Sequence, residues 1–210
     1  LERDFVDSHW DLRQLFRRIL NSATYQRSSI PRSDHAEAAA LFAHYPVRRL
    51  DAEVLIDALC WIGGDGESYS SLIPEPFTHI PGTRRTIALA DGSITSPFLE
   101  TFGRPARDTG LESERNNQPT DAQRLHLLNS TDVQRRIQKS PRLSRLVAAS
   151  KGDRRTLIRE TWLVILSRYP ARAELAAADT YFATPGLTPK QAQEDLAWAL
   201  INGKEFLYRH

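Results

Sequence analysis

The feature of this sequence that most constrains its fold is a series of helix start signals, each followed by apolar residues three and four positions apart. Thr120 with Gln123 forms a capping-box pattern, in which the two side chains satisfy backbone N–H groups at the start of a helix. Thr188 with Gln191 forms a second capping box, and Asp153 is a candidate N-cap between the two. Apolar residues at this spacing occupy one face of a helix, so the sequence predicts a mainly α-helical chain.

The first part of the chain contains three further helix patterns. Ser8 is a candidate N-cap for a helix with one apolar stripe. Asp34 with Glu37 forms another capping box, and the short helix that it predicts ends before Pro46, because the residue before a proline avoids helical backbone angles. The third pattern ends at Gly63, which we expect to adopt the left-handed conformation that is common after a helix. The apolar stripe that follows Ser8 consists of Leu12, Leu15, Phe16, Ile19 and Leu20.

Residues 64–119 interrupt the helical pattern. Gly, Ser and Pro are frequent at the start of this stretch, which is typical of a loop. Ile87 and Leu89 alternate with small or polar residues ahead of Asp91-Gly92, a dipeptide favoured in two-residue turns, so a small β-hairpin is predicted there. The predicted fold is therefore an irregular multi-helix bundle, a single domain over residues 1–210 with a loop- and hairpin-rich insert.

Composition excludes several classes of protein. Apolar residues make up 40% of the chain and charged residues 26%, as in an ordinary globular domain. No apolar run is longer than six residues, far shorter than the roughly 20 residues of a membrane span, so we expect no transmembrane segment. The 28 basic and 26 acidic residues are interspersed, which predicts no nucleic-acid partner. A single cysteine excludes a disulfide within the chain and a multi-cysteine metal site.

Several motifs that carry catalytic chemistry are missing from the sequence: a P-loop, a His-Glu-x-x-His zinc motif, a Gly-x-Ser-x-Gly elbow and a Cys-x-x-Cys-His haem attachment. Cys60 lies on the apolar face of its predicted helix, which favours a buried and inert thiol. His126 lies beside an apolar stripe, which favours a half-buried, hydrogen-bonded histidine. We therefore expect no cofactor in this chain and favour a domain without a catalytic centre.

The densest set of functional side chains lies between residues 104 and 118. Asp108, Glu112 and Glu114 supply carboxylate oxygens, the ligands that a hard cation such as calcium prefers, although their spacing matches no calcium-loop motif. Glu112 and Glu114 are also the candidates for acid or base catalysis. The alternative is that these carboxylates pair with neighbouring arginines and hold the segment in place, and the sequence favours this second interpretation.

Arginine is the other functional residue type of this region. Arginines are candidates for holding an anionic ligand group, and they pair equally well with carboxylates of the protein. Asp51, Glu53 and Asp57 stand close in sequence to two of them and are expected to be such partners. The candidate ligand-binding arginines are Arg104, Arg107, Arg115, Arg48 and Arg49.

Five strings occur in order along the chain: RILNSATYQRSS (18–29), YPVRRLDAEVLIDAL (45–59), FLETFGRPARDTGLESER (98–115), LHLLNS (125–130) and LAWALINGKEFLYRH (196–210). Together they resemble one bacterial family, the planctomycete-specific domain of unknown function found C-terminal to planctomycete-type cytochrome c segments in large surface or exported proteins. The resemblance implies an exported, multidomain parent protein whose haem-binding segment lies upstream, and it implies no established activity. The chain begins at Leu1 and contains no methionine, so we expect it to be a piece of such a protein.

One departure from the family affects the expected chemistry. Relatives often have cysteines in the stretch that here reads Thr109 to Arg115, where Leu111 or Ser113 stands in place of a thiol. Any redox or metal chemistry of those cysteines would be missing from this chain. The sequence thus predicts an accessory domain that interacts with other domains of its parent or with surface proteins. An enzyme domain acting through residues 104–115, a hydrolase or a redox partner, stays open as the alternative, as does a module that binds acidic polysaccharide.

Overall fold

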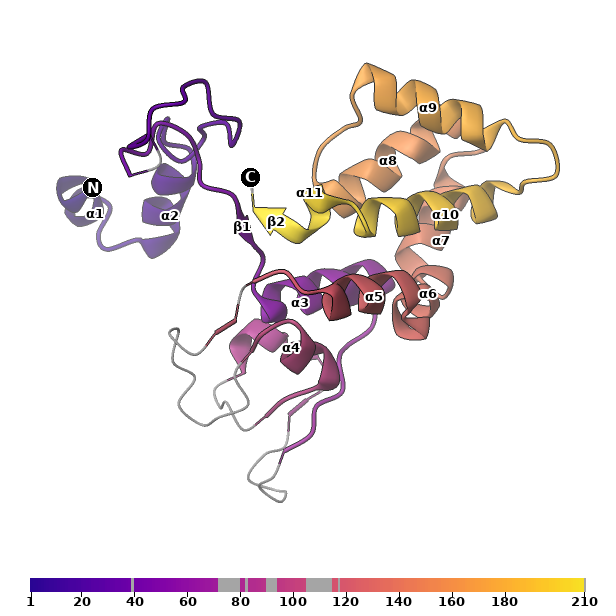
Figure 1. The fold of residues 1–210 in the computed structure, drawn as a ribbon, viewed down its shortest axis with the longest axis horizontal. Helices are drawn as coiled ribbons and strands as arrows, with labels where there is room; N and C mark the ends of the chain where they lie inside the picture. Colours follow the sequence, from indigo (N-terminus) through magenta and orange to yellow (C-terminus); the bar gives the residue numbers. More distant parts are fainter. Residues whose placement is uncertain are drawn as a thin grey trace. The chain divides into compact units, whose positions relative to one another are not determined.

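The chain forms helices along most of its length, as the sequence predicts. It separates into two compact units: unit 1 consists of Leu1–Arg48 with Arg209–His210, and unit 2 of Arg49–Tyr208. The computed structural model (Figure 1) describes residues 1–38, 40–71, 80–81, 83–89, 94–104, 115–116 and 118–209.

Unit 1 begins with two short helices, α1 (Glu2–Asp7) and α2 (Leu12–Leu20). The N-cap of α2 is Asp11, whose carboxylate accepts the N–H groups of Arg13 (2.8 Å) and Gln14 (3.1 Å). The prediction that Ser8 caps this helix is wrong, because Ser8 instead follows the end of α1. Asp11 takes that role because its carboxylate satisfies two free N–H groups of the first turn.

The short helix predicted after Asp34 does not form in the described residues, where turns replace it. The Ser33 hydroxyl accepts the N–H of His35 at 3.2 Å, and Nδ1 of His35 accepts the N–H of Glu37 at 3.2 Å. Such local bonds from side chain to backbone offer the chain an alternative to helical hydrogen bonds. The helix predicted from the Asp34–Glu37 capping box is therefore wrong for the described residues, where the side chains of Ser33 and His35 accept the backbone N–H groups instead.

Unit 2 consists mainly of helices joined by short connections. Side chains that precede a helix accept N–H groups of its first turn at Thr120, Asp153 and Thr188, as the start signals predict, and also at Ser96 and Ser130. The elements of unit 2 are α3 (Ala52–Gly63), η1 (Thr86–Ala88), α4 (Pro97–Thr101), α5 (Asp121–Asn129), α6 (Thr131–Gln138), α7 (Pro141–Ala149), α8 (Arg154–Leu166), α9 (Arg172–Phe182), α10 (Pro189–Ile201) and α11 (Lys204–Leu207). Two-residue strands, β1 (Arg48–Arg49) and β2 (Tyr208–Arg209), form a two-stranded sheet.

The predicted β-strand at Ile87 is wrong: residues 86–88 form the 3₁₀ turn η1. Asp57 on α3 accepts the N–H groups of Thr86 (2.7 Å) and Ile87 (3.1 Å), so its carboxylate caps this turn. The antiparallel pairing that the structure describes here is a single bridge between Ser70 and Thr95. The predicted Asp91-Gly92 turn lies outside the described residues.

Glycine ends α3 one position later than predicted. Gly64, not Gly63, has the left-handed conformation, with φ of 76°. Gly63 is still helical, and a side chain there would come within 3.1 Å of Cβ of Arg136. The second glycine therefore ends the helix, while the first lets α6 approach α3 closely.

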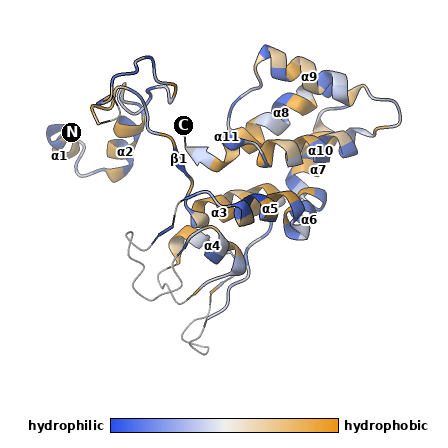
Figure 2. Ribbon diagram, viewed as in Figure 1, coloured by the Kyte–Doolittle hydropathy of each residue, from blue (hydrophilic) through white to orange (hydrophobic). Residues whose placement is uncertain are grey.

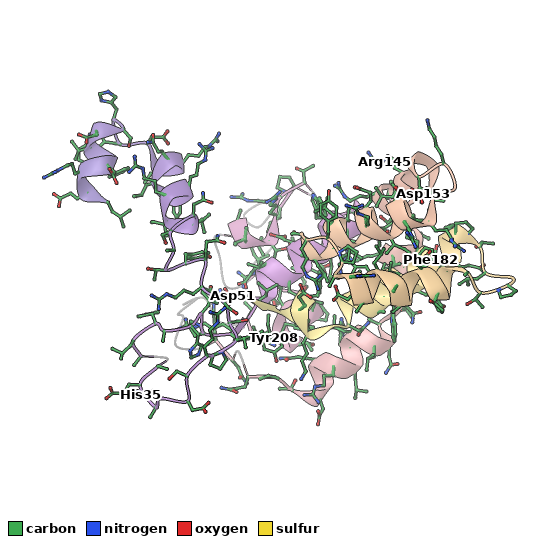
Figure 3. All side chains as sticks on the ribbon, turned by 90° about the horizontal axis from the view of Figure 1, so that it is seen from above. His35, Asp51, Arg145, Asp153, Phe182 and Tyr208 are labelled. Carbon is green, nitrogen blue, oxygen red and sulfur yellow. The ribbon has the colours of Figure 1, made fainter. Side chains whose placement is uncertain are left out.

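Two hydrophobic clusters form the core of unit 2. The first joins α3 and α4 to buried side chains of α5, α6, α7 and α10, and the second lies among α8, α9 and α10. Leu146, Leu166 and Leu200 contact both clusters. Figure 1 shows α8, α9 and α10 together, and Figure 3 labels Asp153 at the start of α8 and Phe182 at the end of α9.

Buried polar side chains join neighbouring helices of this core. The Ser140 hydroxyl, which caps α7, donates to the carbonyl oxygen of Ile62 on α3 at 2.6 Å. Gln193 on α10 donates to the hydroxyl of Thr161 on α8 at 3.2 Å. At the other end of the unit the N–H of Leu50 donates to the carbonyl oxygen of Leu207 at 2.9 Å. Each buried polar atom that gains such a partner avoids the cost of burial without one.

Candidate functional site

Glu53 is the centre of a buried charged cluster in unit 2. It lies in the first turn of α3 and is 6% exposed. Arg115 donates two parallel hydrogen bonds to its carboxylate, each 2.8 Å long. The guanidinium of Arg104 approaches the same carboxylate, with Nε at 3.4 Å from Oε1. We call these residues, together with Arg49, the Glu53 cluster.

Arg49 connects two distant backbone segments within this cluster. Its Nη2 donates to the carbonyl oxygens of Phe102 (2.7 Å) and Asn116 (3.1 Å). Gly103 has φ of 89°, and a Cβ atom there would lie 1.9 Å from the carbonyl oxygen of Asn116. The N–H of Asn116 also donates to the carbonyl oxygen of Gly103 at 3.1 Å. The backbone at 115–116 is therefore held directly against the end of α4, which only a glycine at 103 permits.

The electrostatics of the cluster keep Glu53 ionised. Burial opposes its charged form, but the hydrogen bonds from Arg115 and the charges of Arg115 and Arg104 hold the pKa of Glu53 below its ordinary value. Burial also lowers the pKa of Arg49 from its very high ordinary value. A carboxyl group with a lowered pKa has no proton to donate at neutral pH, so Glu53 is suited to holding arginines rather than to acid catalysis.

The structure places the predicted site residues in different parts of the chain. Arg49, Arg104 and Arg115 meet in the Glu53 cluster of unit 2, whereas Arg48 is an exposed residue of unit 1. Arg48 lines a hollow of about 350 Å³ in that unit. The candidate residues Arg107, Asp108, Glu112 and Glu114 lie outside the described residues, so the predicted cation site and acid–base pair stay predictions.

A second charged cluster, which the sequence analysis missed, surrounds Arg136 on α6. The side chain of Arg136 is 5% exposed and donates to three carboxylates: Asp132 (2.7 Å), Asp65 (2.5 Å) and Glu67 (2.8 Å). The spacing of Asp132 and Arg136, four positions apart on a helix, was visible in the sequence. The other two partners lie more than sixty positions away along the chain, and no local pattern announces them.

Cys60 contacts the Arg136 cluster from α3. Nη1 of Arg136 donates to its sulfur at 3.1 Å. Burial, together with the charges of the neighbouring carboxylates and against that of Arg136, raises the pKa of the Cys60 thiol to about 12. The thiolate is the nucleophilic form of cysteine, so this thiol is unreactive in the folded protein. The sequence-based prediction of a buried cysteine is confirmed.

A third charged cluster surrounds Arg168, which follows α8 and joins α9 to α11. Arg168 donates two hydrogen bonds of 2.8 Å to Glu174 and further ones to Glu205. Glu174 also accepts the N–H of Ala171 at 2.7 Å, so it caps α9 as well. These hydrogen bonds, led by those from Arg168, lower the pKa of Glu174 to about 2.

His126 lies edge-on to the rings of Phe98 and Phe102, and burial lowers the pKa of its imidazole.

Within the described ranges, no three or more His, Cys, Asp or Glu side chains are grouped as a metal ion would require. None of the helices described combines the length and the hydrophobicity needed to cross a bilayer. What the described geometry does is mechanical: the three charged clusters, around Glu53, Arg136 and Arg168, each hold separate segments of the chain together.

Comparison with known families gives one match. The family model PSD1, described as a protein of unknown function (DUF1553), matches residues 1–182. It is the planctomycete cytochrome c-associated domain of unknown function that the five strings resemble. Neither a curated protein nor a solved structure matches the chain.

Proposed function

The chain belongs to the PSD1 family of proteins of unknown function, and we propose that it is a helical interaction domain of a multidomain protein. In this proposal unit 2 is the stable scaffold. Unit 1 presents the apolar face of α2 to another polypeptide, which is a further domain of the parent protein or a surface protein.

The exposed apolar face of α2 carries the proposal. Leu12, Phe16 and Leu20, four positions apart on this helix, are 59%, 60% and 43% exposed. Ala38 is the one buried hydrophobic residue among the described residues of unit 1. Figure 2 shows hydrophobic residues along α2. Apolar surface that gathers on one face, rather than being scattered singly, marks a contact site.

The rest of α2 indicates what kind of partner fits this face. Arg13 and Arg17 lie on the helix beside the apolar stripe, whereas Arg18 lies on the opposite side and pairs with Asp4 of α1 at 2.5 Å. Amphipathic helices of this type bind in an apolar groove through residues at i, i+4 and i+8, while charged residues at the rim set the orientation. A polypeptide partner with an apolar groove and acidic residues at its rim is therefore the expected occupant.

The scaffold role of unit 2 is supported by its charged clusters. Glu53 binds Arg115 and Arg104, and Arg136 and Arg168 each bind two or more carboxylates. The carboxylates of these clusters are thus engaged within the protein, as is typical of a structural network.

The last part of the proposal concerns location. We place the parent protein outside the cytoplasm, with its haem-binding segment outside this chain. The resemblance of the five strings supports this placement.

Hydrogen exchange tests the interaction role. The backbone amides of α2 are compared between the isolated 210-residue chain and the longest natural protein that contains it. We expect slow exchange at α2 in the longer protein and fast exchange in the isolated chain, because a docked helix opens less often. Phe16→Ser should abolish the added protection, whereas Leu125→Ser, at a residue of α5 that is similarly exposed (57%), should leave it unchanged.

Equal exchange of α2 in the two proteins would refute the proposal. Protection that persists in the Phe16→Ser variant would refute the assignment to this face. Both variants alter exposed residues, and such substitutions change the free energy of unfolding by about 0.5 kcal/mol or less. The melting temperature of the isolated chain should therefore stay within about two degrees of the original.

A further inference from the structure

A hollow of about 580 Å³ lies among helices α8, α9 and α10 of unit 2. This volume falls within the roughly 300–1,000 Å³ range of small-molecule sites. Four aromatic side chains line it: Trp162, Tyr181, Phe182 and Trp198. Alanines of α9 and α10 line the space between them, which leaves the aromatic rings as its largest surfaces. Phe182 is labelled in Figure 3.

Some aromatic rings outside the hollow already have a guanidinium over their faces, whereas among the described residues the rings of the hollow do not. Elsewhere, arginines lie over aromatic rings: Arg142 is 3.8 Å from the ring centroid of Trp61, and Arg159 is 5.0 Å from that of Tyr169. In the described part of the chain, no guanidinium lies over any of the four rings of the hollow. Tyr181 and Trp198 are also 44% and 37% exposed, so a ligand from solvent can reach them.

The charged residues that line the hollow are both acidic. They are Glu174 and Asp195, and no lysine, arginine or histidine is among its lining residues. Arg168 neutralises Glu174 through two hydrogen bonds, so Asp195 contributes most of the negative charge. The hydroxyl of Tyr181 donates to Asp195 at 2.7 Å, and this hydrogen bond raises the pKa of Tyr181. Tyr181 thus remains a neutral donor to the carboxylate of Asp195.

We propose that this hollow binds a small organic cation, a positively charged nitrogen that carries apolar substituents. The faces of Trp and Tyr rings attract such a cation. Asp195 supplies the opposite charge at the rim, and the alanines accommodate the apolar substituents. An anionic ligand would be repelled by Asp195, and a neutral apolar one would gain nothing from it. The proposal concerns unit 2 alone and does not depend on the docking of α2.

Choline is a suitable probe because dimethylbutanol is its neutral isostere, with carbon in place of the charged nitrogen. Binding of each to the complete chain is measured by calorimetry and by tryptophan fluorescence. We expect saturable binding of choline, and binding of dimethylbutanol that is weaker by roughly three- to thirtyfold, the factor that corresponds to a cation–π contact. Binding of choline should also weaken as the salt concentration rises, because Asp195 is exposed.

Two variants locate the binding. Asp195→Asn should weaken choline by roughly three- to tenfold and leave dimethylbutanol unchanged, since it removes the charge and keeps a side chain of the same shape. Trp198→Leu keeps an apolar side chain and removes an aromatic face, so choline should again be weakened by a similar factor. Trp61→Leu is the matched control, because Trp61 is an exposed tryptophan of α3 and does not line the hollow. This variant should bind choline as the original protein does.

The outcomes are decisive in either direction. The absence of saturable choline binding overturns the proposal, and so does equal affinity for choline and dimethylbutanol. Choline binding that Asp195→Asn leaves unchanged overturns the assignment to this hollow. The melting temperature of each variant shows whether it is folded. Because Asp195 is exposed, we expect Asp195→Asn to fold, and this variant tests the proposal even if Trp198→Leu fails to fold.

Discussion

Arg136 provides the sharpest test of how charge supports this fold. We expect Arg136→Met to destabilise unit 2 at neutral pH, because Met keeps the aliphatic length of the side chain and leaves three carboxylates without their shared partner. The pair with Glu67 is the buried one, with side chains 5% and 13% exposed. Asp65 and Asp132 are about two-fifths exposed, so water screens them.

The expected magnitude follows from this difference in burial. Loss of one partner from a buried pair costs about 3–5 kcal/mol, whereas exposed pairs contribute about 0–1 kcal/mol each. The total loss for Arg136→Met is therefore about 3–5 kcal/mol, dominated by Glu67. For a chain of this size that corresponds to a drop in melting temperature of about 6–20 °C.

The loss should also depend on pH. Burial already raises the pKa of Glu67, against the charge of Arg136, and removal of Arg136 raises it further. A carboxyl group with a raised pKa in the folded state destabilises the fold above that pKa and not below its unfolded pKa. In the original protein burial opposes the charged form of Asp132, but the hydrogen bonds from Arg136 and Arg135 outweigh this effect and lower the pKa of Asp132, so the stability that Asp132 contributes is lost only as the pH falls below its ordinary pKa of 3.8. The difference between variant and original protein is therefore smaller at pH 4 than at pH 7 mainly because of Glu67.

Urea and thermal denaturation followed by circular dichroism measure both effects. Arg135→Met is the matched control: Arg135 is the next residue on α6, pairs with Asp132 and is 53% exposed. Its loss should cost about 0.5 kcal/mol or less. If Arg136→Met costs no more than Arg135→Met at pH 7, or if its cost is the same at pH 4, the reasoning about Glu67 is wrong.

Two other features give predictions of their own. Gly103→Ala should destabilise the fold by more than about 2 kcal/mol, because the left-handed conformation and the clash with Asn116 both oppose a side chain there. Gly152→Ala, which is also at positive φ but has open space around it, should cost only about 1–2 kcal/mol. Equal losses in urea denaturation would contradict the close approach at Gly103. Cys60, with its raised pKa of about 12, should react with a thiol reagent at pH 8 only on unfolding, and fast reaction in native buffer would contradict its burial.

Short-range patterns predicted most helix starts, because the residues that make them are neighbours. Ser96, Thr120 and Thr188 each accept an N–H group three positions ahead, so sequence alone contains both partners. Asp34 shows the limit of this reasoning. Its capping-box pattern is equally local, but bonds through Ser33 and His35 compete with the helix, and the sequence does not show which arrangement is more stable.

The structural elements that sequence reasoning missed depend on distant partners. The residues around Ile87 have the alternation of a strand, yet Asp57, about thirty positions earlier, caps them as a 3₁₀ turn. In the same way, the density of charge between 104 and 118 pointed to a site within that segment, and Arg104 and Arg115 are found on Glu53 of α3. Neither partnership has a local spacing, so only the fold reveals it.

The choice of arginine over lysine follows from the same geometry. Of the 28 basic residues only 4 are lysine, and the lysine ion pair that the described residues contain, Lys190 with Glu194, lies on the surface. Arg115, Arg136 and Arg168 each use two or more nitrogens at once, which a single ammonium group on a flexible stem cannot do. The abundance of arginine in this chain therefore reflects the joining of distant segments by planar, many-donor groups. A lysine at Arg136 would keep the charge and still lose the contacts that hold α3 to α6.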